Sequence, residues 1–356
     1  MSAQVNRIQF LDGFRGLAIA MVIVFHAYVA WAEIVPYGNK FSGYLIFNKG
    51  WLGVQLFFLI SGFVILMTLE KTKNFVDFIK KRWLRLFPSM LIATVLMYAT
   101  ANYFYERPEG VPELKDVIPG LVFLNPNLLS AIFHTKFGVL EGSFWSLYVE
   151  FKFYIIFGLL YFYLGKSKAI LGIVFLFALQ FITHGLTLFS DNPWFATINT
   201  LFVQLGFSQF GWFATGSFLY LYYISKTKKN LIYALIIGLL AALNLGETVN
   251  LVIAGMLVFL IFVFAVRFDS WKIFFSNKIF VYLGFVSYPL YLIHQNFMIS
   301  MIIKLNSWLP EIPSLLLPLL PIGLLVLVSH IIAKHVEPII YGFLKDKLLS
   351  KPKMIS

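Results

Sequence analysis

Stretches of eighteen or more apolar residues recur along the whole chain, and they limit its possible folds more than any other feature. A transmembrane helix needs about 20 consecutive, predominantly apolar residues to cross the hydrocarbon core of a bilayer. The composition agrees with this interpretation, because the 356 residues are 60% hydrophobic and only 12% charged. Soluble globular domains carry about 25% charged residues. The sequence therefore predicts an all-α, polytopic integral membrane protein.

Counting the apolar runs between polar breaks predicts about ten transmembrane helices, near residues 14–33, 50–70, 86–104, 143–164, 168–188, 206–224, 230–246, 249–267, 282–304 and 314–333. With the N-terminus placed in the cytoplasm, the inner segments hold 21 Lys and Arg residues, the outer segments hold six, and Lys152 falls within a span. Basic residues concentrate in cytoplasmic loops, so this bias predicts that both termini are cytoplasmic. It also accounts for the net charge of +12 without a nucleic-acid partner.

No linker or internal repeat separates a second domain, so we expect one transmembrane domain over residues 1–340 and a cytoplasmic basic tail at 341–356. The longest non-spanning segment, near 105–142, is expected on the outer side. We expect the first apolar run to be retained as a span, because Arg15 and His26 are unusual in a signal peptide. The chain has no Cys, which excludes disulfides, thiolate metal sites and a cysteine acyl-enzyme.

The first apolar run, FLDGFRGLAIAMVIVFHAYVAW at residues 10–31, carries Asp12, Arg15 and His26. On a helix, Arg15 and His26 lie within about 20° of the same face and roughly 16 Å apart. An ionisable group near mid-membrane costs about 2.5–3.5 kcal/mol on insertion scales, so such groups usually face a cavity and serve a function. The three residues therefore predict a polar track from the cytoplasm to mid-membrane. The alternatives are a boundary ion pair for Asp12 and Arg15 and an interhelical hydrogen bond for His26.

Other ionisable residues lie in or beside later spans. Arg82 and Arg85 share one cytoplasmic helix face, in an arrangement that suits phosphate groups as well as simple membrane anchoring. Glu150 lies in the fourth predicted span, and Lys152, about 200° around the helix, is not expected to pair with it. His294 lies near the middle of the ninth, where packing and functional roles are equally open. Because G-x-S-x-G, Walker A, H-E-x-x-H and G-x-G-x-x-G motifs are absent, any chemistry must use an intramembrane base and charged groups.

Taken together, these motifs resemble the acyltransferase-3 family of integral membrane acyltransferases. The matching segments run in family order from residue 8 to about 338: LDGFRGLAIAMVIVFH, GVQLFFLISGFVI, RWLRLFP, FWSLYVEFKFY, LGFVSYPLYLIHQ and VEP. One departure is Lys152, where relatives often have an acidic or amide residue. We expect no fused hydrolase-like domain after the last span.

The resemblance implies transfer of an acyl group, most often acetyl, from cytoplasmic acetyl-CoA to a sugar hydroxyl of a surface or exported glycan, such as lipopolysaccharide O-antigen. His26 is expected to be the general base, a role that the ordinary pKa of histidine, about 6.5, suits. Arg15 and Asp12 are expected to support it, and Glu150 to position the acceptor. Direct transfer and an acyl-histidine relay both fit. No metal is expected.

The same resemblance predicts the binding residues. Arg82, Arg85 and Ser61 are expected to contact acetyl-CoA, and Trp145 and His294 to contact the glycan or lipid-linked glycan acceptor. The expected location is a bacterial inner membrane, with membrane lipid around the chain. The oligomeric state is left open.

Two other classes of function remain possible. Spans that contain His, Glu and Lys could form a proton-coupled transporter for a glycan intermediate. No pair of spans broken by Gly or Pro recurs in matching halves, which weakens that interpretation. The third possibility is a non-catalytic partner in a glycan export complex.

Overall fold

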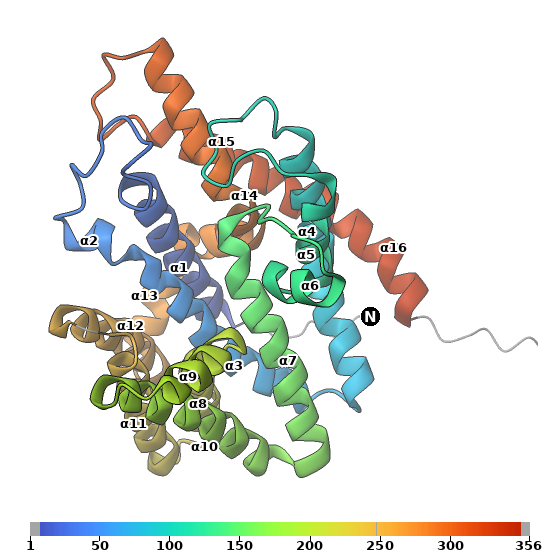
Figure 1. Ribbon diagram of the computed structural model, residues 1–356. Helices are drawn as coiled ribbons and strands as arrows, with labels where there is room; N and C mark the ends of the chain where they lie inside the picture. Colours follow the sequence, from blue (N-terminus) through green and yellow to red (C-terminus); the bar gives the residue numbers. More distant parts are fainter. Residues whose placement is uncertain (1–7, 247, 350–356) are drawn as a thin grey trace, which may run out of the picture. The chain divides into compact units, whose positions relative to one another are not determined.

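The structure is a computed structural model that describes residues 8–246 and 248–349, and every regular element in these residues is helical (Figure 1). The all-α prediction is therefore confirmed for the described residues. The end of the predicted basic tail, residues 350–356, lies outside them. The α-helices are α1 (Gln9–Tyr28), α2 (Leu45–Asn48), α3 (Gly53–Leu69), α4 (Phe75–Ala99), α5 (Ile118–Val122), α6 (Pro126–Phe133), α7 (Trp145–Leu164), α8 (Lys166–Phe189), α9 (Pro193–Gln204), α10 (Phe210–Ser225), α11 (Lys228–Leu243), α12 (Val249–Arg267), α13 (Asp269–Phe275), α14 (Lys278–Trp308), α15 (Leu319–Ile331) and α16 (Glu337–Leu349).

Short helical turns extend or join several of these helices. Single 3-10 turns are found at Gly50–Leu52, Leu114–Val117, Gly142–Phe144 and Phe207–Gln209. A π-helical turn at Ile332–Val336 joins α15 to α16 without a break.

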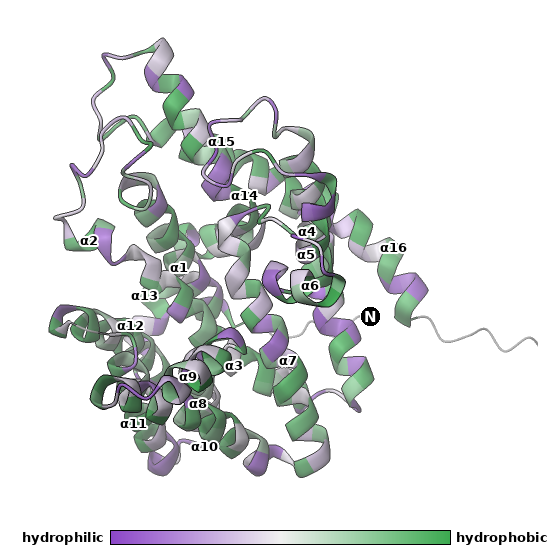
Figure 2. Cartoon of the chain, in the orientation of Figure 1, coloured by the Kyte–Doolittle hydropathy of each residue, from purple (hydrophilic) through white to green (hydrophobic). Residues whose placement is uncertain are grey.

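Six helical stretches in the described residues are long and apolar enough to span a membrane: Gln9–Tyr28, Gly50–Leu69, Gly142–Leu164, Lys166–Phe189, Val249–Arg267 and Leu319–Leu349. Two bent pairs raise the number to eight if each is one span, namely Leu114–Val122 with Pro126–Phe133 at 113° and Asp269–Phe275 with Lys278–Trp308 at 63°. Figure 2 shows apolar residues along most of α8, α11 and α12. The chain is thus a multi-pass membrane protein.

The predicted count of ten spans is not reached by these criteria. The predicted spans at 206–224 and 230–246 correspond to α10 and α11, which have 16 residues each. At 1.5 Å per residue each is about 24 Å long, shorter than a hydrocarbon core of about 30 Å. The predicted span at 86–104 corresponds to α4, whose first half carries Lys80, Lys81, Arg82 and Arg85. The count of ten and the cytoplasmic placement of the termini stay predictions.

The chain divides into two compact units. The first comprises residues up to Val22, Lys49–Phe78 and Val149–Gly284, and the second comprises Ile23–Asn48, Ile79–Tyr148 and the residues from Phe285 onward. Four helices, α1, α4, α7 and α14, contribute residues to both units.

In the first unit, α10 is the central helix and packs against α3, α8, α11 and α12. Its crossing with α3 depends on glycine, because a Cβ at Gly62 would lie 2.0 Å from the carbonyl oxygen of Phe213, and one at Gly216 would lie 2.0 Å from that of Leu59. The Ser217 hydroxyl donates to the Gly62 carbonyl at 3.1 Å. Small residues allow helices in membranes to approach this closely and to gain contacts between backbones.

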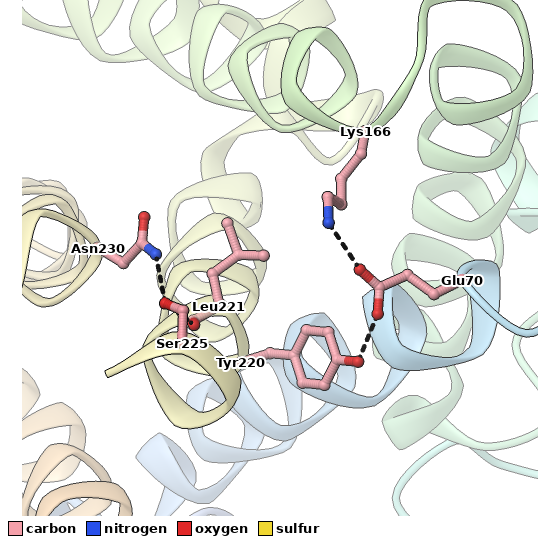
Figure 3. Close-up of polar contacts among 6 residues, drawn as sticks. All are labelled: Glu70, Lys166, Tyr220, Leu221, Ser225 and Asn230. Atoms are coloured by element: carbon pink, nitrogen blue, oxygen red, sulfur yellow. Dashed lines mark hydrogen bonds and ion pairs between the residues drawn. The ribbon is translucent and has the colours of Figure 1, made fainter. Parts of the chain in front are cut away.

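An acidic side chain ties three helices of the first unit together. Glu70, the residue after α3, accepts hydrogen bonds from Lys166 at the start of α8 and from the hydroxyl of Tyr220 on α10, at 3.0 and 2.5 Å (Figure 3). The two donors reach different oxygens of the carboxyl group, so Glu70 contacts both neighbours at once.

Replacing Gly62 by alanine should force α3 and α10 apart. The added methyl carbon would overlap the Phe213 carbonyl, and overpacking of this kind typically costs about 1–3 kcal/mol of stability. Thermal unfolding of the purified protein in detergent measures this effect. The control is Gly185→Ala on α8, where an added Cβ meets no atom within 4 Å and helix propensity favours alanine by about 1 kcal/mol. Equal effects of the two substitutions would show that α3 and α10 do not approach closely.

Candidate functional site

Two histidines of the second unit, His26 on α1 and His294 on α14, lie in direct contact. Nδ1 of His26 and Nε2 of His294 are 3.2 Å apart, and the ring centroids are 4.7 Å apart at an interplanar angle of 77°. His294 is fully buried, whereas His26 is partly exposed. The structure therefore brings together the predicted base and the histidine whose role the sequence left open.

The protonation pattern of this pair follows from its hydrogen bonds. Nδ1 of His294 lies 2.8 Å from the carbonyl oxygen of Tyr291. Because a carbonyl oxygen only accepts, neutral His294 is assigned its proton on Nδ1 and its lone pair on Nε2. Nδ1 of His26 then donates to that lone pair, which leaves the lone pair of His26 on Nε2. A neutral imidazole in this state can take a proton or attack an acyl carbon.

Two serines contact Tyr291, whose carbonyl fixes His294. The Ser143 hydroxyl donates to the Tyr291 carbonyl at 3.1 Å, and the Ser146 hydroxyl lies 2.7 Å from the Tyr291 phenol oxygen. All three residues are buried. Trp145, the predicted acceptor contact, begins α7 beside Ser146 and is 42% exposed.

The predicted pair at the start of α1 is present in the first unit. Arg15 Nη1 lies 2.8 Å from Asp12 Oδ1, and Asp12 is buried while the Arg15 side chain is 28% exposed. Gly13 lies directly against α13, because a Cβ there would be 1.6 Å from the Phe275 carbonyl oxygen. The glycine beside the ion pair therefore allows α1 to pack tightly enough to bury Asp12.

A second polar cluster of the first unit surrounds Glu150 on α7. Its Oε1 accepts hydrogen bonds from the Ser61 hydroxyl on α3 at 2.6 Å and from the Tyr154 hydroxyl at 2.5 Å. Lys152 donates instead to the backbone carbonyl of Gln204, which confirms that it does not pair with Glu150. Ser61 was predicted to contact acetyl-CoA and Glu150 to position the acceptor, and the structure shows that the two side chains form a hydrogen bond with each other.

The predicted phosphate-binding arginines lie on α4. The Arg85 side chain is 51% exposed and forms an ion pair with Glu337 at 3.4 Å, and its guanidinium lies 5.6 Å from the ring centroid of Tyr288. Ser89 donates to the other oxygen of Glu337 at 2.6 Å. Arg82 is partly exposed. A phosphate bound at Arg85 must therefore compete with the Glu337 carboxylate.

Sequence reasoning missed a buried polar network in the second unit, centred on Arg107. Its two terminal nitrogens donate to the backbone carbonyls of Met97 and Leu140 at 3.1 and 2.7 Å. Asn296 on α14 also donates its side-chain amide to the Leu140 carbonyl at 2.9 Å, and its backbone N–H donates to Glu141 at 3.3 Å. Because Asn296 is two residues from His294, the network anchors the loop before α7 to the part of α14 that carries this histidine.

The acidic members of this network lie outside the candidate spans and have shifted pKa values. Burial raises the pKa of Glu141 well above its ordinary value, an effect that the charge of Arg107 opposes. Burial also raises the pKa of Glu109, which accepts a hydrogen bond from Gln295 at 3.5 Å, and lowers that of Arg107. The network is thus least stable when both carboxyl groups are ionised.

Some of the missed residues had a sequence signal. Tyr154 lies four residues after Glu150, one helical turn away on the same face, so a contact was predictable. Glu337 lies in the VEP segment, but its pairing with Arg85 joins residues 252 positions apart. Contacts between residues so far apart in the sequence can be identified only from the tertiary structure.

These features define a membrane helical domain with paired histidines and several buried carboxylates. The family model described as an acyltransferase domain matches residues 8–333. The chain belongs to the acyltransferase-3 family.

Curated relatives cover parts of the chain. It is 28% identical over 173 residues to the O-acetyl transferase of Shigella phage Sf6, which is 47% of this chain and 50% of that protein. It is 27% identical over 158 residues to the peptidoglycan O-acetyltransferase OatA of Listeria monocytogenes, which is 41% of this chain and 23% of that protein. It is 27% identical over 188 residues to the O-acetyltransferase OatA of Staphylococcus aureus, which is 49% of this chain and 28% of that protein. The chain thus spans half or less of the relatives' length, and no solved structure matches.

Replacing Glu141 by glutamine should flatten the dependence of stability on pH. A carboxyl group whose pKa is raised in the folded state stabilises the fold below its ordinary pKa of 4.5, and this contribution is lost as the pH rises through the raised pKa. The slope for one proton is at most about 1.4 kcal/mol per pH unit in that window. The melting temperature in detergent, measured from pH 4 upward, tests this.

The matched control is Glu113→Gln, which removes an exposed carboxylate from the same segment and should retain the wild-type slope. Identical slopes for wild type and Glu141→Gln would show that Glu141 does not titrate differently in the folded and unfolded states.

Proposed function

We propose that this protein is an O-acyltransferase of a bacterial inner membrane that moves an acetyl group from cytoplasmic acetyl-CoA to a sugar hydroxyl of a surface or exported glycan. Family membership supports acyl transfer, and the names of the relatives support acetyl as the group and oxygen as its acceptor. The observation that carries the proposal is the His26–His294 hydrogen bond, because it leaves a basic nitrogen on His26.

In the direct route, Nε2 of His26 takes the proton of the acceptor hydroxyl. The hydroxyl oxygen then forms a bond to the thioester carbon, and the carbon–sulfur bond breaks. The imidazolium of His26 returns the proton to the departing thiolate, so the products are the acetyl ester and CoA thiol. In the alternative route, Nε2 first attacks the thioester carbon, and the carbon–sulfur bond breaks to release CoA thiolate. The acceptor hydroxyl then attacks the acetyl carbon, the carbon–nitrogen bond to His26 breaks, and the hydroxyl proton passes to the thiolate, so the products are the same.

His294 acts in both routes as a positioning residue. Its lone pair accepts the Nδ1 proton of His26, and this hydrogen bond strengthens when His26 becomes positively charged. The serines around Tyr291 keep the ring of His294 oriented. The arrangement corresponds to a base whose tautomer is set by a third group.

The remaining residues are assigned supporting roles. Arg82 and Arg85 bind phosphates of CoA, for which Arg85 exchanges its Glu337 partner. Asp12 orients Arg15 on the same helix as His26. Glu150 positions the acceptor, and Ser61, expected from the sequence to contact the donor, orients Glu150 through its hydroxyl.

The acceptor proposed is lipopolysaccharide O-antigen. The Listeria relative is named for peptidoglycan, so the test must examine both glycans. Deleting the gene and analysing both fractions by mass spectrometry should reveal the loss of one acetyl group from O-antigen, with peptidoglycan unchanged. Loss of a whole glycan, or no change in either fraction, would instead support transport or assembly.

The substitution His26→Ala should abolish acetylation without unfolding the protein. Loss of a general base typically costs about 10²–10⁴ in rate, whereas loss of an interhelical hydrogen bond costs about 0.6–2 kcal/mol of stability. Acetyl transfer and thermal unfolding are measured on the same purified variant. His184→Ala on α8 is the control and should retain activity. Substantial transfer by folded His26→Ala would exclude His26 as the base.

Two substitutions at His294 should differ in their effect. The side-chain oxygen of glutamine can accept the Nδ1 proton of His26, whereas phenylalanine fills similar space and cannot. His294→Gln should therefore keep at least tenfold more activity than His294→Phe, with a shifted pH–rate profile. Equal activities in the two folded variants would mean that the hydrogen bond to His26 does not set its tautomer.

A further inference from the structure

The first unit contains a cavity that the proposed chemistry does not use. It has a volume of about 570 Å³ and is lined by Tyr222, Tyr223, Lys226, Arg267, Asp269 and Lys272. This volume lies within the range of small-ligand sites, about 300–1,000 Å³. The lining residues come from the end of α10, the end of α12 and the start of α13. The positive-inside bias predicts that these helix ends face the cytoplasm.

The charges around the cavity do not balance. Three cations and one carboxylate line it, and Asp269 is paired with Lys272 at 2.7 Å. In the described part of the chain no carboxylate lies within ion-pair distance of Lys226 or Arg267. Arginine binds phosphate oxygens in pairs and lysine adds a point charge, so the excess of cations over carboxylates favours a phosphate group.

The position of Lys226 is fixed by its turn. Lys226 has a left-handed backbone with φ of 56°, and it ends α10. The flanking Ser225 donates to the Leu221 carbonyl at 2.7 Å and accepts a hydrogen bond from Asn230 at 3.3 Å (Figure 3). The Lys226 ammonium lies over the rings of Tyr222 and Tyr223, at 5.6 and 5.2 Å from their centroids.

One wall of the cavity is formed by two tyrosine rings that pack against neighbouring residues. Tyr222 is buried, and the ring of Tyr223 packs against Phe63 and Phe10 at centroid distances of 5.6 and 6.1 Å. Large apolar side chains beside the cavity are exposed: Phe268, Trp271, Ile273 and Phe274. Aromatic and apolar side chains at a basic surface are typical of the headgroup level of a membrane.

From this geometry we propose that the cavity, defined by Lys226, Arg267, Lys272 and the two tyrosines, binds a phosphate group carried by a molecule at the cytoplasmic membrane surface. Two molecules bring such a group there: an anionic phospholipid, through its headgroup, and acyl-CoA, through its nucleotide end. The second source depends on the proposed function, whereas the first does not. The site is separate from Arg82 and Arg85, which line no part of it.

The test uses the full chain in phosphatidylcholine nanodiscs with two probes. Phosphatidylglycerol is added to the nanodiscs and its retention is measured by native mass spectrometry, and CoA binding is measured by calorimetry with pantetheine as the phosphate-free reference. The variant is Lys226→Gln/Arg267→Gln. The control is Lys228→Gln/Lys229→Gln, which removes the same charge from the adjacent start of α11 and leaves the lining intact.

The first variant should lose at least tenfold in affinity for one or both probes, and the control should remain within threefold of wild type. Loss with phosphatidylglycerol alone identifies the headgroup, and loss with CoA alone identifies the nucleotide. Equal losses in both variants would show that the probes bind through general surface charge and not in the cavity, which would overturn the proposal. Unchanged binding in the first variant would overturn it as well. If the double variant does not fold, Arg267→Lys tests the same point, because it keeps the charge and removes the paired donors. These measurements need no acetyl transfer, so their failure is distinct from failure of the proposed function.

Discussion

The hydrocarbon core of a bilayer offers no hydrogen-bond partner, so polar side chains inside these helices are stabilised by partners within the chain. Glu150 is held by Ser61 and Tyr154, and His294 is held between His26 and the Tyr291 carbonyl. Each contact also fixes which helices are neighbours and in which rotation. The polar residues that carry the proposed chemistry are therefore also residues that specify how the helices pack.

Close packing of other helix pairs depends on glycine. Gly62 allows the backbones of α3 and α10 to approach, and Gly13 does the same for α1 against α13. At the first of these crossings the Ser217 hydroxyl reaches the Gly62 carbonyl at 3.1 Å. Bulkier residues at the glycine positions would separate the helices and leave buried groups without partners, which costs about 1–3 kcal/mol for each group.

The all-α class and the helix that contains Asp12, Arg15 and His26 were predictable, because apolar length and helical period are local properties of the sequence. The pairing of Arg15 with Asp12 was predictable as well, since the two are one turn apart. The contact of His26 with His294 was not, because depth in the membrane does not identify the neighbouring helix. The count of ten spans stays a prediction, because apolar composition does not fix helix length, and α10 and α11 have only 16 residues each.

The hydrogen bond from His294 to the Tyr291 carbonyl limits where protons can move through the histidine pair. The Tyr291 carbonyl oxygen is too weakly basic to take the Nδ1 proton of His294. The histidine pair therefore does not form a proton-transfer pathway between the two sides of the bilayer. In the proposed reaction, the proton that His26 removes from the acceptor hydroxyl therefore leaves by the same nitrogen, Nε2. Under the proposed reaction it departs with the CoA thiol, and each turnover moves an acetyl group without drawing on the transmembrane proton gradient.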